Sequence, residues 1–99
     1  MSVFVLFRVE IKEGREEEYR KIAAEVLQNA QEQPGLIFME RAKSVLKEGT
    51  YISISEWENE EAIEKWVNHP QHQEAMRKGK SELFNWYSVK RMIELQKGG

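Results

Sequence analysis

The spacing of hydrophobic and polar positions changes several times along the chain. The opening run SVFVLFRVEIK is rich in valine and phenylalanine and predicts a strand of about nine residues. Positions 3–7 are all apolar, so both faces of this strand are expected to be buried. The next segment has helical spacing and ends at the sequence QPG. Its apolar positions form one stripe: Tyr19, Ile22, Ala23, Val26, Leu27 and Ala30.

Three further segments have the composition and alternation of strands. LIFMERAKSV predicts a second strand, and KEGT predicts the turn that follows it. In YISISEW, Ser53, Ser55 and Trp57 share one face, while Ile52 and Ile54 occupy the other. NWYSVKRMIELQ alternates again and predicts the last strand.

Two helices are predicted between the third and the last strand. Asn59 suits the N-cap of a short first helix, and Pro70 suits the first turn of the second. His72, Met76 and Leu83 recur at helical spacing, so they are expected on one inward face. The element order is therefore the α+β, ferredoxin-like β-α-β-β-α-β arrangement, a four-stranded antiparallel sheet with helices on one face, formed by residues 1–99 as a single domain.

This arrangement leaves one face of the sheet without a covering layer. The first strand and residues 36–39 are nevertheless apolar on both faces. A bare apolar face of several hundred Å² is uncommon in a monomer. A second copy of the chain covers such a face by two-fold symmetry, so we expect a homodimer that associates through the sheet faces.

Composition excludes several classes of function. Fifteen basic and 17 acidic residues give a net charge of −2, with no basic footprint for nucleic acid. No apolar run is long enough to span a bilayer, and the N-terminus lacks the pattern of a signal peptide. There is no cysteine, so disulfides, thiolate metal sites and cysteine nucleophiles are excluded. We therefore expect a cytoplasmic protein with no membrane or nucleic-acid partner.

The candidate chemistry is concentrated between positions 53 and 76. His72 is the one base with an inward aim, and a half-buried imidazole can act as a general base near neutral pH. Ser53 and the Trp57 indole are candidate donors to a bound oxyanion. Core packing is the alternative account of Trp57 and His72, and packing alone explains Trp66. Two histidines without a third ligand do not make a metal site, and no phosphate loop or nucleophile elbow occurs.

Three arginines interrupt the apolar pattern of predicted strands: Arg8, Arg41 and Arg91. Surface or edge positions are the simplest explanation for all three. An arginine that points into a cavity could instead hold a quinol oxygen or a carboxylate by paired hydrogen bonds.

The stretch YISISEWENEEAIEKWVNHPQHQ, together with the element order, resembles the antibiotic biosynthesis monooxygenase family. Its most specific part is the run from Trp57 to Ala62, followed by His-Pro and a second histidine. The resemblance covers nearly the whole chain and implies a dimeric α+β barrel with a pocket between sheet and helices. In the family's enzymes, small quinol-type aromatics are oxidised by dioxygen without metal or flavin, and a related branch binds and degrades haem.

The functional residues that the resemblance implies are only partly present. In the quinol-oxidising branch, Trp57 matches, but Ser53 stands in place of an Asn, Ile63 in place of an aromatic hydroxyl, and Met76 in place of an Arg. In the haem-degrading branch, Trp66 matches, whereas Phe7 falls near an Asn and Met76 near the haem-ligating His. Loss of that imidazole removes the bond to iron.

Three functions follow from these comparisons. The first is a small cofactor-independent monooxygenase with dioxygen as co-substrate, which oxidises an aromatic or quinol-like molecule. His72 is its candidate catalytic base, and Trp57, Ser53, Trp66 and Met76 are its candidate substrate-binding residues. The second is a non-catalytic dimeric protein that binds an apolar small molecule or acts in a stress response. The third, which the residues support least, is a haem-degrading monooxygenase.

Overall fold

A computed structural model describes residues 2–99. Eight elements follow one another along the chain: β1 (Val3–Ile11), α1 (Glu16–Gln31), β2 (Leu36–Lys43), β3 (Thr50–Trp57), α2 (Glu60–Val67), α3 (Pro70–Lys78), the π-helical turn η1 (Gly79–Leu83) and β4 (Phe84–Met92). Within the described residues, no helix has the length and apolar character needed to cross a membrane.

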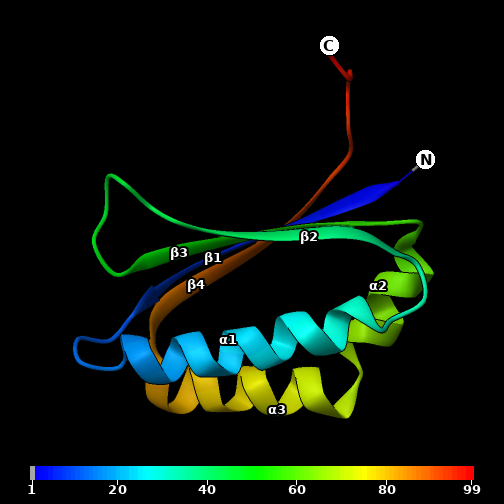
Figure 1. Ribbon diagram of the computed structural model, residues 1–99. Helices are drawn as coiled ribbons and strands as arrows, with labels where there is room; N and C mark the ends of the chain where they lie inside the picture. The colour runs from blue at the N-terminus through cyan, green and yellow to red at the C-terminus, as the bar shows by residue number, and fades with distance from the viewer. Residues whose placement is uncertain (1) are drawn as a thin grey trace.

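The four strands form one antiparallel sheet in the order β2-β3-β1-β4. Figure 1 shows α1, α2 and α3 on the same side of this sheet, with α1 and α3 running alongside each other. The predicted ferredoxin-like α+β arrangement is therefore confirmed, with the second helical region divided into α2, α3 and η1.

The core between sheet and helices has two clusters. The first gathers near the start of α1 and contains Val9, Ile11, Tyr19, Tyr51 and Leu83. The second gathers near the end of α1 and contains Ala30, Trp57, Ile63 and Trp66. Strand β3 contributes Tyr51 to the first cluster and Trp57 to the second. Side chains alternate along a strand, and these two fall on the side that faces the helices. The predicted stripe of α1 likewise supplies buried residues to both clusters.

The opposite face of the sheet has no covering layer within residues 2–99 (Figure 1). Since Val5 lies on the helix side, its neighbours Phe4 and Leu6 project from the open face. They pair in register with Glu56 and Ile54. Phe38 stacks edge-on against Phe4 at 6.3 Å and remains 39% exposed. The open face is thus apolar at its centre, as the unbroken apolar runs predicted.

The last strand is shorter than predicted. It ends at Met92, so Ile93 and Leu95 lie outside the sheet, and Leu95 is 92% exposed. Figure 1 shows the C-terminal segment rising from the open face. The hydrophobic alternation continues past Met92, but the pairing of β4 with β1 stops at Met92, opposite Phe4 and one residue from the start of β1. Alternation alone therefore overestimates the length of this strand.

Both predicted helix starts are present. Asn59 Oδ1 accepts a hydrogen bond from the Ala62 N–H at 2.9 Å, which is the expected N-cap. His69 forms the cap of α3. Its Nδ1 accepts from the Gln71 N–H at 3.2 Å, and its ring packs 5.7 Å from that of Trp66.

Candidate active site

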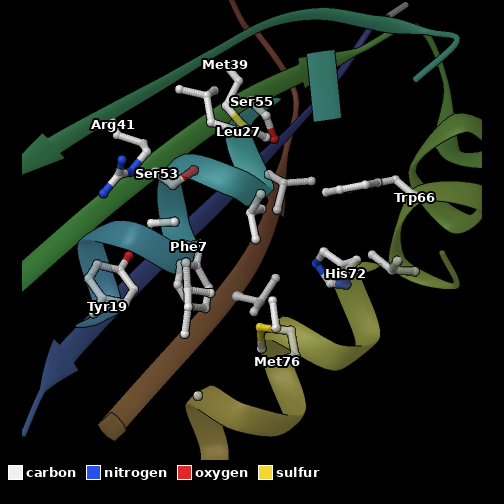
Figure 2. Close-up of a pocket in the computed structure, with 18 of the residues that line it drawn as sticks. Phe7, Tyr19, Leu27, Met39, Arg41, Ser53, Ser55, Trp66, His72 and Met76 are labelled. Carbon is white, nitrogen blue, oxygen red and sulfur yellow. The ribbon is translucent and has the colours of Figure 1, made fainter. Parts of the chain in front are cut away.

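A cavity of about 200 Å³ lies between the helix-facing side of the sheet and the helices. Its lining is predominantly apolar and comes from every strand and helix of the fold, including η1. All five residues predicted for the site line this one cavity: Ser53, Trp57, Trp66, His72 and Met76. Figure 2 shows Ser53 on the sheet side, with Met76 and His72 approaching from α3.

Two tryptophans form the wall of the cavity near α2. The rings of Trp57 and Trp66 are stacked with centroids 6.5 Å apart and an interplanar angle of 24°. Trp57 is only 1% exposed, and its Nε1 donates to Ser55 Oγ at 2.9 Å. The indole N–H, predicted as a donor to an oxyanion, thus already has a partner within the core. Trp57 can still present its ring surface to an aromatic ligand.

His72 lies in the first turn of α3, where it is half-buried and shares the cavity with Trp66. The two rings meet edge to face at 5.1 Å. Burial lowers the pKa of His72 from its ordinary value, the Val67 backbone opposes this effect, and positive charge on His69 and Lys80 adds to it. His72 is therefore a neutral imidazole at pH 7, with a nitrogen lone pair available to accept a proton.

The far end of the cavity is polar, and sequence reasoning largely missed it. Arg41 and Tyr19 both line the cavity, and the Arg41 guanidinium carbon lies 6.0 Å from the centroid of the Tyr19 ring. Figure 2 shows the Tyr19 hydroxyl directed toward Arg41, with Ser53 beside them. Burial raises the pKa of Tyr19, and the charge of Arg41 opposes that effect, so the phenol stays protonated at neutral pH.

The three strand arginines have different surroundings. Arg8 lies on the open face, 5.5 Å from the Trp86 ring centroid. Arg91 forms ion pairs with two carboxylates of α2, those of Glu60 and Glu64. Only Arg41 enters the cavity. The alternation of β2 places Arg41 on the same face as Met39. It does not indicate which of the two faces the helices cover, so the sequence alone does not place Arg41 in the cavity.

An open groove between α3 and β4 adjoins the cavity. It shares His72, Met76, Val67 and Val89 with the cavity lining, so these residues border both spaces. Its remaining residues are mostly polar or basic and belong to α3, η1 and β4. A ligand can therefore reach His72 from solvent along the outer edge of the sheet.

No group of three or more histidine, aspartate or glutamate side chains positioned to hold a metal ion occurs among residues 2–99. His69, the other histidine, is committed to the cap of α3 and does not line the cavity. The polar side chains that the cavity offers for chemistry include those of His72, Ser53, Tyr19 and Arg41.

The fold and the cavity together define a class: ferredoxin-like α+β proteins with a small apolar pocket between sheet and helices. The sequence profile described as "Antibiotic biosynthesis monooxygenase" matches residues 2–78. The chain belongs to this family. It is also 30% identical over 80 residues to the uncharacterised protein YqjZ of Bacillus subtilis. The matched segment covers 81% of this chain and 68% of YqjZ.

Solved structures show the same fold. SnoaB from Streptomyces nogalater, described as a cofactor-independent oxygenase, has a TM-score of 0.86 at 17% identity, covering 97% of this chain and 95% of that chain. Rv0793 from Mycobacterium tuberculosis has a TM-score of 0.90 at 13% identity over 100% of both chains. A further structure, described as an antibiotic biosynthesis monooxygenase, has a TM-score of 0.86 at 13% identity, covering 95% of this chain and 99% of that chain.

Proposed function

We propose that this protein is a cofactor-independent monooxygenase that oxidises a small aromatic, quinol-like substrate with dioxygen in the cavity between sheet and helices. One observation carries the proposal: the cavity combines an apolar, aromatic-walled interior with a single neutral, half-buried imidazole, His72. A mainly apolar pocket with few polar groups suits a flat aromatic ligand. A volume of about 200 Å³ suits one or two fused rings.

The proposed reaction requires no electron donor other than the substrate. A phenol loses its O–H proton to His72, and the phenolate, held by hydrogen bonds in a dry pocket, gives up electrons from its ring to dioxygen. One oxygen atom replaces the hydrogen on a ring carbon and the other leaves as water, so that the phenol and O₂ become a quinone and H₂O. Ser53, beside Arg41 at the other end of the cavity, is the proposed donor to a second substrate oxygen, and the stacked rings of Trp57 and Trp66 orient the substrate.

Oxygen uptake with a panel of naphthols and hydroquinones tests this proposal, with the uncatalysed oxidation rate subtracted. The acid limb of kcat/KM should have an apparent pKa below the ordinary histidine value of 6.5, because burial lowers the pKa of His72. His72→Ala should reduce kcat/KM by about 10²–10⁴-fold, the usual contribution of a general base. The control is His69→Asn, which preserves the α3 cap and lies outside the cavity.

A retained rate in His72→Ala would remove His72 from the mechanism. Tight binding of naphthols without oxygen consumption would instead support the alternative, a non-catalytic dimeric protein that carries a small apolar molecule. The geometry gives haem no support. The cavity is below the ~300–1,000 Å³ typical of sites for drug-sized ligands, and the axial position of the haem branch is occupied by Met76.

The open face of the sheet supports a homodimer as the functional unit. Phe4, Leu6, Ile54 and Phe38 project from this face without a covering layer among the described residues. A second copy of the same sheet buries this surface by two-fold symmetry. The cavity lies on the other side of the sheet, so pairing through the open face leaves its entrance free.

Light scattering at micromolar concentration tests the dimer. Leu6→Glu places a charge at the centre of the open face and should give a monomer. Lys21→Glu, on the exposed side of α1, makes a larger change in charge and should leave the dimer intact. A monomeric wild-type protein would contradict the proposal directly.

A further inference from the structure

Arg41 carries a charge that no carboxylate balances. It is half-buried against Tyr19 at one end of the cavity, and it takes part in none of the ion pairs among residues 2–99. A half-buried charge without a partner is costly, and buried charges are usually paired. The Arg41 guanidinium therefore lacks an anionic partner, and the side of it that does not contact Tyr19 faces the cavity.

The carboxylate of Glu16, which begins the same helix as Tyr19, is already occupied. Glu16 accepts a hydrogen bond from Tyr51 Oη at 2.7 Å and lies 3.7 Å from Lys43 Nζ. The same Tyr51 oxygen accepts from Arg20 at 3.1 Å, and these contacts hold the pKa of Glu16 below its ordinary value. Two cations, Lys43 and Arg20, thus act on this one carboxylate, which therefore does not balance the charge of Arg41.

The entrance groove shows the same bias. Arg77 and Lys80 line it, and no aspartate or glutamate side chain of residues 2–99 lines either the groove or the cavity. Arg77 is paired with Glu74, whereas Lys80 lies over the Tyr87 ring at 5.5 Å without a carboxylate partner. This distribution is notable because the whole chain has a net charge of −2. Lys80 therefore leaves the groove with one unbalanced positive charge, which attracts anions.

We propose that the ligand of this cavity is an aromatic carboxylate: a one- or two-ring hydroxyaromatic acid whose carboxylate binds the Arg41 guanidinium and the Tyr19 hydroxyl. This inference rests on the proposed function only in using the same cavity as the substrate site. Arginine presents paired N–H donors that match a carboxylate, and a protonated tyrosine adds a third donor.

The two ends of the cavity fix the orientation of such a ligand. Tyr19 is in the first turn of α1 and His72 in the first turn of α3, and Figure 2 shows them at opposite ends of the lining residues. The α1 residues that line the cavity run from Tyr19 to Leu27, about 12 Å at 1.5 Å per residue. A carboxylate at Arg41 therefore places the remote hydroxyl of a bicyclic acid near His72.

Binding of two matched probes tests the inference. 6-Hydroxy-2-naphthoate carries its hydroxyl and carboxylate at opposite ends, and 2-naphthol lacks only the carboxylate. Calorimetry without oxygen should show the acid binding about 10- to 100-fold more tightly than the naphthol, the range for a charge-assisted hydrogen-bonded pair. Arg41→Gln should abolish this preference while the affinity for 2-naphthol stays the same. Arg41→Lys should retain part of it, and the exposed Lys21→Gln should retain all of it.

Equal affinities of the two probes for the wild type, or no binding of the acid, would overturn the inference without any variant. So would an equal loss for both probes in Arg41→Gln, which would indicate a structural role. Oxygen uptake separates this inference from the proposed function. Arg41-dependent binding without uptake contradicts only the oxygenase, whereas uptake with 2-naphthol and no preference for the acid contradicts only the carboxylate site.

Discussion

Gly79 is a position where two physical effects oppose each other. It is buried at the junction of α3 and η1, with an ordinary right-handed backbone at φ −57° and ψ −52°. Since alanine is the better helix former, Gly79→Ala should gain about 1 kcal/mol from backbone entropy alone. An added Cβ, however, would lie 2.3, 2.5 and 2.8 Å from three carbons of the Phe84 ring.

The Phe84 ring has aromatic neighbours that restrict its movement. It is surrounded by Phe7 at 6.0 Å, Tyr87 at 5.9 Å and Tyr19 at 6.2 Å between ring centroids. Overpacking a core of this kind costs about 1–3 kcal/mol, and a ring held on three sides places this site in the upper half of that range. Subtracting the helix-propensity gain leaves Gly79→Ala less stable than wild type by about 1–2 kcal/mol. Steric overlap should therefore dominate over propensity.

Urea unfolding at fixed protein concentration measures this balance. The midpoint should fall with an unchanged m-value, and the melting temperature should fall by about 4–8 °C for each kcal/mol lost. In a Phe84→Leu background, which removes the ring, Gly79→Ala should be neutral or stabilising. A midpoint at or above that of wild type in the single variant would show that the ring yields and that the steric argument is wrong.

Three further predictions concern His72, Trp57 and Asn59. Burial lowers the pKa of His72 in the folded state, so the neutral imidazole stabilises the fold fully above about pH 6.5. This stabilisation is lost as pH falls through the lower pKa of the folded state. The urea midpoint of the wild type should therefore fall as the pH is lowered below 6.5, and that of His72→Gln should fall less. Trp57→Phe removes the donor to Ser55, leaves a buried hydroxyl without that partner, and should lower the unfolding free energy by about 1–3 kcal/mol. Asn59→Ala removes the cap of α2 and should cost about 1 kcal/mol, while Asn59→Asp should keep most of the stability in the same assay.

The fold was predictable because its signals are local and repeated. The stripe beginning at Tyr19, the alternation around Ser53 and the cap at Asn59 each follow from one period or one hydrogen bond. The end of β4 was not predictable in this way. Its end depends on where pairing with β1 stops, opposite Phe4, and the sequence beyond Met92 does not record that position.

The site was predictable only in part, for a related reason. His72 and Met76 share a helical face, so their convergence on one space follows from spacing. Arg41 and Tyr19 belong to β2 and α1, and only packing of the helices on one particular face brings them together. For Trp57, the sequence suggested an indole N–H free to donate to a ligand. In the structure this N–H donates to Ser55, two residues away on the same face of β3.

The position of Arg41 bears on which substrates should be tried. The family resemblance implies an arginine on the last helix, where this chain has Met76. Arg41 instead supplies a guanidinium from β2, near the first turn of α1. A substrate whose polar group binds an arginine would thus be held from the sheet side rather than from the helix side. Neutral quinols would leave Arg41 without a partner, whereas a hydroxyaromatic acid would engage it, so the oxygen-uptake panel should pair each naphthol with the corresponding hydroxyaromatic acid.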